Sequence, residues 1–268
     1  MNTAHRAERL INLSALEFDV LTEHLEIDSV PLVLKVPSPG RTHAERAKLV
    51  ASAWRALSKR GLISGGALDA ELERMLRLVA EPGREVDGRS WLHRSVRVLA
   101  AAESDGERAV LAVKDGEHLS FSATSASGLP RAAVSRLPEL APGPGRSVSV
   151  PSAALDEAAA EVGDKIEQLL SALQRRGVRP DDAEALAGMV AGVVAQGQFG
   201  AAARLRHGRR ERAERVVGFF DTALGRYAQL RTTSPSGEAW STIAPADNRR
   251  LVGLVEELLD EVTGSAVR

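Results

Sequence analysis

The sequence predicts an α+β fold, in which antiparallel strands follow one another along the chain and the helices are segregated from them. Two observations lead to this prediction. Apolar residues change from helical to alternating spacing, and the order of helices, strand meander and helix occurs twice. We therefore expect one domain over residues 1–268, with pseudo-repeat halves at about 1–141 and 146–268 that share one sheet.

The N-terminal segment predicts three helices. Ser14 and Thr42 are expected N-caps, because each is followed three residues later by a glutamate that completes a capping box. A short extended segment is expected at 31–36 between these two helices. The third helix is expected at about 68–80, where Leu72 and Leu76 lie on one face and Pro82-Gly83 ends the pattern.

Strand patterns follow this third helix. Leu92, Val96 and Val98 predict a first strand, and residues 109–114 predict a second. Asp115-Gly116 is a strong hairpin signal, and alternating residues at 119–124 predict the returning strand. A short helix at about 130–137 closes this half.

A proline- and glycine-rich segment at 141–145 is the expected internal boundary. Residues 146–150 predict one more strand. Two helical segments follow, at about 154–176 and 180–195.

The region from Gln196 to Asp247 predicts three or four short strands separated by tight turns. Turns are expected near His207-Gly208, at 222–225 and at 234–237. A strongly amphipathic last helix follows, whose apolar stripe begins at Leu251, Leu254, Val255 and Leu258.

Composition excludes several functional classes. The formal net charge is −1, whereas a dedicated nucleic-acid-binding domain usually carries a basic excess. Cysteine is absent, which rules out disulfide scaffolds and thiolate chemistry. No apolar run is long enough for a transmembrane helix, so we expect a cytoplasmic protein that does not insert into membranes.

No motif for catalysis or cofactor binding is found. The six histidines are scattered and form no metal-ligand pair. Gly143-Pro144-Gly145 resembles a phosphate loop only superficially, because Pro144 lacks the backbone N–H that a phosphate cradle uses. We expect a protein without enzymatic activity, metal or cofactor.

The sharpest charge feature is the basic run from Arg204 to Arg215. One hypothesis makes it a nucleic-acid-binding or regulatory hairpin. The other makes it a solvated hairpin, because Glu211 and Glu214 dilute its charge and no aromatic side chain within the run offers a stacking surface. The second is favoured, and we expect no nucleic-acid partner.

Several segments resemble the EspG family of type VII secretion chaperones of actinobacteria. Their order and spacing carry the resemblance over nearly the whole chain. The N-terminal and middle segments are PLVLKVPSPGRT (31–42), RGL (60–62), LDAEL (68–72) and LPELAPGPGRSVSVP (137–151). The more specific segments are GQFG (197–200), VGFFDT (217–222), GRY (225–227) and WSTIAPAD (240–247).

The resemblance implies a mostly antiparallel central sheet flanked by two helical groups, with quasi-two-fold halves. It also implies a cytoplasmic chaperone that binds the hydrophobic tip of PE/PPE-type helical-hairpin substrates, keeps them soluble and delivers them for export. A homodimer in the absence of substrate stays an open alternative.

The family's binding surface comprises the sheet and the C-terminal helical group, and no residue motif transfers directly. Geometry therefore selects the candidates. We expect partner contacts from Val190, Val193 and Val194 on the helix before the sheet, from Phe220 on the sheet, and from Leu251, Leu254 and Val255 on the last helix. The alternative is that these residues are ordinary core.

Overall fold

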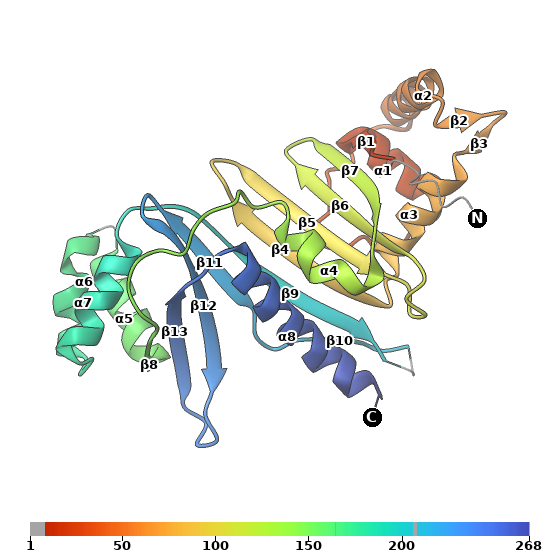
Figure 1. Ribbon diagram of the computed structural model, residues 1–268. Helices are drawn as coiled ribbons and strands as arrows, with labels where there is room; N and C mark the ends of the chain where they lie inside the picture. The colour runs from red at the N-terminus through yellow and green to blue at the C-terminus, as the bar shows by residue number, and fades with distance from the viewer. Residues whose placement is uncertain (1–8, 164, 206–207, 268) are drawn as a thin grey trace.

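The computed structural model describes residues 9–163, 165–205 and 208–267. Its centre is one large antiparallel sheet (Figure 1). The strands along it are in the order β1-β7-β6-β5-β4-β9-β11-β12-β13-β8, and β10 pairs with β9 beside this path. A separate two-stranded sheet joins β2 (Ile63–Ser64) and β3 (Ala67–Leu68).

The N-terminal half of the chain supplies one half of the sheet: β1 (Ile11–Ser14), β4 (Arg84–Trp91), β5 (Ser95–Ala102), β6 (Ala109–Asp115) and β7 (His118–Thr124). The C-terminal half supplies the other: β8 (Val148–Pro151), β9 (Val193–Arg204), β10 (Arg210–Arg212), β11 (Val217–Thr222), β12 (Gly225–Thr233) and β13 (Ala239–Pro245).

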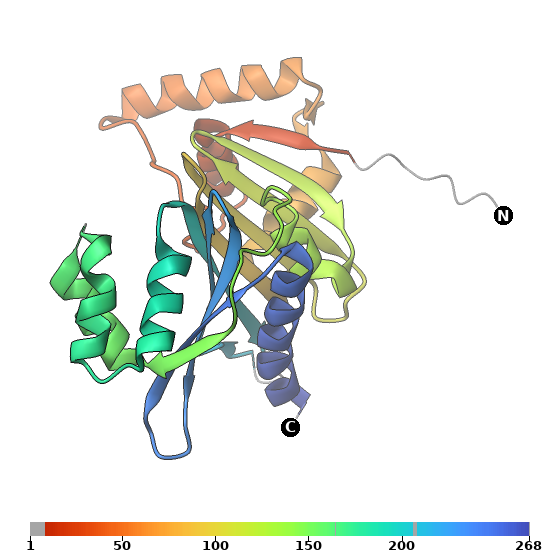
Figure 2. The same ribbon diagram turned by 60° about the vertical axis from the view of Figure 1, so that its left-hand side comes forward.

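Helices cover both faces of the sheet. On one face, α1 (Ala15–His24), α2 (His43–Lys59) and α3 (Ala70–Ala80) lie at one end, and α5 (Ser152–Val162), α6 (Leu169–Arg175) and α7 (Pro180–Val190) lie at the other. On the opposite face, α4 (Leu129–Val134) and α8 (Asn248–Val267) pack on the central strands. Figures 1 and 2 show the two helical groups at opposite ends, with α8 running along the middle.

The two halves use their elements in the same order. In each half, a strand that ends at the outer edge is followed by three helices, a four-stranded meander and a final helix that packs under the sheet centre. The halves meet where β4 pairs with β9, with Asp87 opposite Gly200 and Gly88 opposite Phe199.

Close packing holds this seam together. The rings of Phe199 and Phe219 stack at 5.8 Å between centroids. A Cβ on Gly88 would lie 2.7 Å from Val98 and 2.8 Å from Phe199, so only glycine fits there.

A buried arginine joins strands β11 and β12 to the start of α8. Arg226 is fully buried, and its Nε donates to Asp221 Oδ1 at 2.6 Å. It also donates to Asn248, the first residue of α8, and to the carbonyl of Pro138. A buried guanidinium is tolerated only when it is paired and hydrogen-bonded in this way.

The predicted capping boxes and most of the predicted turns are present in the structure. Both capping boxes form, at Ser14 with Glu17 and at Thr42 with Glu45. The turn at Asp115-Gly116 joins β6 to β7, and turns at 222–225 and 234–237 join the predicted strands. The predicted turn at His207-Gly208 falls partly outside the described residues, although β9 and β10 form the expected hairpin.

The largest error is β4, which the sequence did not predict. The expected strand began at Leu92, but Leu92 lies in the turn between β4 and β5. The residues of β4 do alternate, but the pattern does not look like a buried strand, because the charged Glu85 and Asp87 occupy buried positions where an apolar residue is expected.

Two predicted helices and one predicted extended segment also differ from the structure. The predicted helix 154–176 is interrupted at Gly163, whose φ of +52° cannot continue a helix. The predicted helix 180–195 ends at Val190, because Gly192 has φ +68° and β9 begins directly after it. Residues 31–36 are not extended, since Leu34 N–H donates to the carbonyl of Pro31 in a turn.

Candidate functional site

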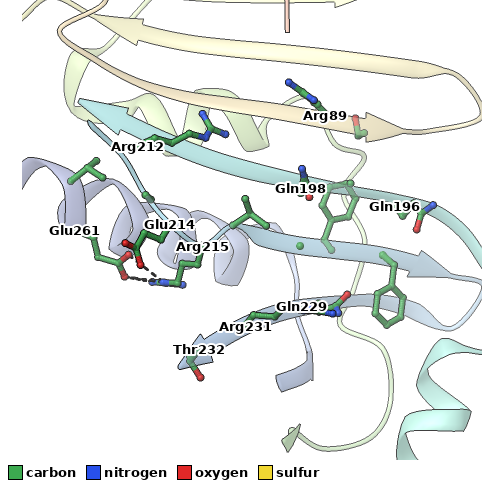
Figure 3. A pocket seen from close by; sticks show the side chains of 18 of the residues that line it. Arg89, Gln196, Gln198, Arg212, Glu214, Arg215, Gln229, Arg231, Thr232 and Glu261 are labelled. Carbon is green, nitrogen blue, oxygen red and sulfur yellow. Dashed lines mark hydrogen bonds and ion pairs between the residues drawn. The ribbon is translucent and has the colours of Figure 1, made fainter. Parts of the chain in front are cut away.

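The central strands have one uncovered face, between α1–α3 and α5–α7, which we call the open face. A groove of about 1140 Å³ lies on it. β4, β9, β11 and β12 form its floor, and the segment 211–216 and the last turns of α8 form one rim. Figure 3 shows Arg89, Gln196, Gln198 and Gln229 along these neighbouring strands.

An aromatic row crosses one end of the groove. Antiparallel pairing places Trp91 opposite Gln196, Gln196 opposite Phe220, and Phe220 opposite Tyr227. Directly opposed residues share a face of the sheet. Trp91 is 55% exposed, whereas Phe220 is 7% exposed and stacks on Tyr227 at 5.2 Å. In this row, Trp91 is the exposed apolar side chain, and Phe220 and Tyr227 are buried in the sheet beside it.

Two exposed valines lie at the start of β9, two and three residues before Gln196, and they do not line the groove itself. Val193 pairs with Thr222 at the start of β9, and the register shift beside it leaves one extra residue in β9. Val193 is 42% exposed and Val194 53% exposed. Such a bulge turns side chains out of the regular alternation, which accounts for two neighbouring exposed valines.

A second row crosses the middle of the groove. It runs from Arg89 to Gln198, Gly218 and Gln229, each directly opposite the next. In the other direction, Arg89 lies opposite Arg97, which lies opposite Lys114. The middle of the open face is thus polar, with guanidinium and amide groups in place of apolar side chains.

Beyond the second row, ion pairs connect strands β4 and β10. Arg210 and Arg212 of β10 reach across β9 to Glu85 and Asp87 of β4. Both carboxylates are buried, and burial raises the pKa of Glu85 although Arg210 opposes the shift. Arg212 donates to both oxygens of Asp87, and this pairing raises the pKa of Arg212.

These pairs account for much of the predicted basic run. Arg210, Arg212 and Arg215 each face a carboxylate, the last on Glu261 of α8. Arg204 donates to the carbonyl of Gly208. The charge of the hairpin is therefore largely neutralised within the fold.

The structure separates the predicted partner residues. Val190 is half-buried at the end of α7, and Val193 and Val194 lie on β9 and not on the helix where they were expected. Phe220 lies at the floor of the groove. Leu251, Leu254 and Val255 are at most 2% exposed and pack against the opposite face of the sheet, so they are not available on the open face.

Trp91 was the main residue missed. It is exposed and lines the groove, but it ends the strand that the sequence did not predict. The alternation of Val86, Gly88 and Ser90 with Glu85, Asp87 and Arg89 was the available signal.

Nothing on the open face suggests a reaction. Within the described residues, no group of three or more potential ligands could hold a metal ion. No described helix is long and apolar enough to cross a membrane. The arrangement can bind an apolar segment with polar surroundings.

Comparisons with known proteins agree with this architecture. The fold resembles the type VII secretion system chaperone EspG5 of Mycobacterium tuberculosis, solved in complex with a PE25–PPE41 dimer. The TM-score is 0.73 at 18% identity, covering 95% of this chain and 97% of that one. No curated protein matches the sequence. The model of the EspG family matches residues 14–257, and the chain therefore belongs to the EspG family.

Proposed function

We propose that this protein is a non-catalytic, cytoplasmic secretion chaperone. Its client is a helical-hairpin substrate of the PE/PPE type, whose hydrophobic tip it covers until export. Membership of the EspG family and the likeness to EspG5, which was solved with a PE25–PPE41 dimer, support the class of client. The observation that carries the proposal is the open face, where the exposed Trp91 lines a largely polar groove.

The aromatic row and the two valines would supply the apolar contact. Exposed apolar groups gathered at one end of a groove are typical of an interaction surface. Covering the exposed half of Trp91 would contribute about 2–3 kcal/mol, at ~25 cal/mol per Å². Trp91 is therefore the expected anchor, and Val193 and Val194 extend the same contact.

The buried stripe of α8 has a different part in this proposal. Leu251, Leu254 and Val255 would support the sheet from behind and would not touch the client. A charged substitution there would unfold the chaperone. Binding and folding can therefore be separated by choosing residues on the open face.

Co-expression with the helical-hairpin protein encoded nearest to this one, followed by size-exclusion chromatography, tests the proposal. We expect a stoichiometric complex that Trp91→Asp weakens by at least about thirtyfold. Leu10→Asp is the matched control, because Leu10 is 60% exposed beside the outer strand β1. Absence of a complex, with the client still insoluble, would contradict the chaperone proposal.

The nucleic-acid alternative makes an opposite prediction. Binding through the Arg204–Arg215 hairpin would weaken steeply with salt. We expect no such binding, because carboxylates already face Arg210, Arg212 and Arg215. Measurable, salt-sensitive binding to a 20-base-pair DNA or a single-stranded RNA would favour the alternative.

A further inference from the structure

Three cations lie side by side on the N-terminal part of the open face. Pairing places Lys114 of β6 opposite Arg97 of β5, and Arg97 opposite Arg89 of β4. We call these residues the cation row. The same cross-strand row continues from Lys114 to Leu119 at one end and from Gln229 to Ile243 at the other. Leu119 packs beneath α1–α3 and Ile243 beneath α5–α7. The cation row therefore lies on the same face as the groove.

The cation row has no carboxylate partner within the described ranges. Arg89 is exposed and Arg97 is half-buried, and both line the groove. Neither forms an ion pair or a side-chain hydrogen bond with a described residue. Lys114 donates to the backbone carbonyl of Lys35 at 2.7 Å and forms no ion pair with a described residue, although the charge of Glu117 acts on it.

The charged residues that precede Arg89 on β4 are paired, unlike the cation row. Glu85 and Asp87 lie on the same strand as Arg89 and point to the same face, and each has an arginine partner. Carboxylates can therefore be accommodated on this face, but no described carboxylate forms an ion pair with Arg89, Arg97 or Lys114.

An unbalanced row of like charges is unfavourable for the fold. Like charges directly opposite one another in a sheet destabilise it. Burial lowers the pKa of Lys114, the nearby charge of Arg97 lowers it further, and the charge of Glu117 opposes the shift. The equivalent positions in the C-terminal half are Gln198, Gly218 and Gln229, so the architecture does not require cations.

We propose that the cation row binds carboxylate side chains that the client carries next to its apolar tip. This inference rests on the proposed chaperone function and names a second feature of its client. Paired guanidinium groups suit carboxylates because each can donate two parallel hydrogen bonds. One client segment can then place its apolar residues on Trp91 and its acidic residues on Arg89 and Arg97. Arg89 is two residues from Trp91 along β4, and Arg97 lies opposite Arg89 on β5.

The rim of the groove selects isolated carboxylates over a polyanion. Glu211, Glu214 and Glu261 line the same groove, and Figure 3 shows Glu214 and Glu261 beside Arg215. Glu261 is paired with Arg215, so Glu211 and Glu214 are the acids that would repel a continuous phosphate backbone laid along the groove. A peptide with one or two carboxylates can avoid them, because its charges are local.

The test uses labelled synthetic peptides and fluorescence anisotropy on the full-length protein. One capped peptide carries a Leu-Leu-Phe centre with glutamates on one side, and its twin carries glutamine at those positions. We expect the glutamate peptide to bind about tenfold or more tightly at low salt, and high salt to remove most of this preference. Equal binding of the twins, or no binding of either, would overturn the inference.

The variant Arg89→Gln/Arg97→Gln copies the amide chemistry of the opposite half. We expect it to lose the preference for glutamate while its melting temperature stays unchanged or rises. The matched control is Arg55→Gln/Lys59→Gln on the outer face of α2, which should keep the preference. A lowered melting temperature with the preference intact would show a structural role instead.

Two further results keep the inference separate from the proposed function. If a 20-base-pair DNA binds as tightly as the glutamate peptide, the cation row is a general anion surface and the inference is wrong. If the client complex forms equally well with Arg89→Gln/Arg97→Gln at every salt concentration, the inference fails and the chaperone function stands.

Discussion

The N-terminal and C-terminal halves of the sheet are built on the same plan but present different chemistry on the open face. The middle row crosses Lys114, Arg97 and Arg89 in the first half, and Gln198, Gly218 and Gln229 in the second. The exposed valines belong to the second half alone. Two halves with the same order of elements thus carry different side chains on the open face.

The buried supports of the two halves differ as well. The C-terminal half depends on Arg226, which is fully buried and joins β12 to Asp221, Asn248 and Pro138. The central strand of the N-terminal half instead carries Glu85 and Asp87, whose arginine partners are partly exposed. Water can therefore replace a partner in the first half more easily than in the second.

The largest expected effect comes from breaking the buried pair. Asp221→Ala leaves the guanidinium of Arg226 without its carboxylate, which should cost about 3–5 kcal/mol of unfolding free energy. Urea denaturation measures this loss. The control Asp156→Ala removes the ion-pair partner of Arg231 at the surface, where both side chains are about half exposed. It should cost less than about 1 kcal/mol. Similar losses for both variants would contradict the contrast.

A smaller, pH-dependent effect is expected in the N-terminal half. Because burial raises the pKa of Glu85, the folded protein holds that proton more tightly than the unfolded chain. The contribution of Glu85 to stability is then full below its ordinary pKa of 4.5 and is lost as the pH rises through the folded value.

The variant Glu85→Gln checks this direction. Relative to wild type, its unfolding free energy should improve between pH 4 and pH 7, by about 1 kcal/mol or less. Urea midpoints at the two pH values give the comparison. A variant that becomes less stable relative to wild type as the pH rises would show that Arg210 outweighs the cost of burial.

The smallest expected effect on stability comes from Val194→Thr. This position is 53% exposed at the bulge in β9, so the unfolding free energy should change by less than about 0.5 kcal/mol. Client binding should still weaken, because a hydroxyl replaces an apolar contact. The same substitution at Val110, which is 1% exposed in β6, should destabilise the fold clearly. Equal thermal melting of the two variants would refute the assignment of Val194 to the surface.

Much of the fold could be predicted because its signals are local. The capping boxes at Ser14 and Thr42 and the turn at Asp115-Gly116 are each set by a few neighbouring residues. The strand β4 could not be predicted in this way. Its buried Glu85 and Asp87 are compatible with a strand only because Arg210 and Arg212 lie opposite them, 125 residues later in the chain.

The site was predicted less well for a related reason. Leu254 and Val193 are both apolar residues in patterned segments, and only tertiary packing separates them into 2% and 42% exposed side chains. Trp91 was missed together with its strand. The amphipathic stripe of α8 was the stronger pattern, and it marks core instead of surface.

Site-specific photocrosslinking tests most directly whether the client covers the open face. A photoreactive phenylalanine analogue would replace Trp91, Val194 or Arg55 in separate variants, each co-expressed with the helical-hairpin client. We predict crosslinks to the client from positions 91 and 194 and none from position 55 on the outer face of α2. Crosslinks from position 55, with none from positions 91 and 194, would contradict the account.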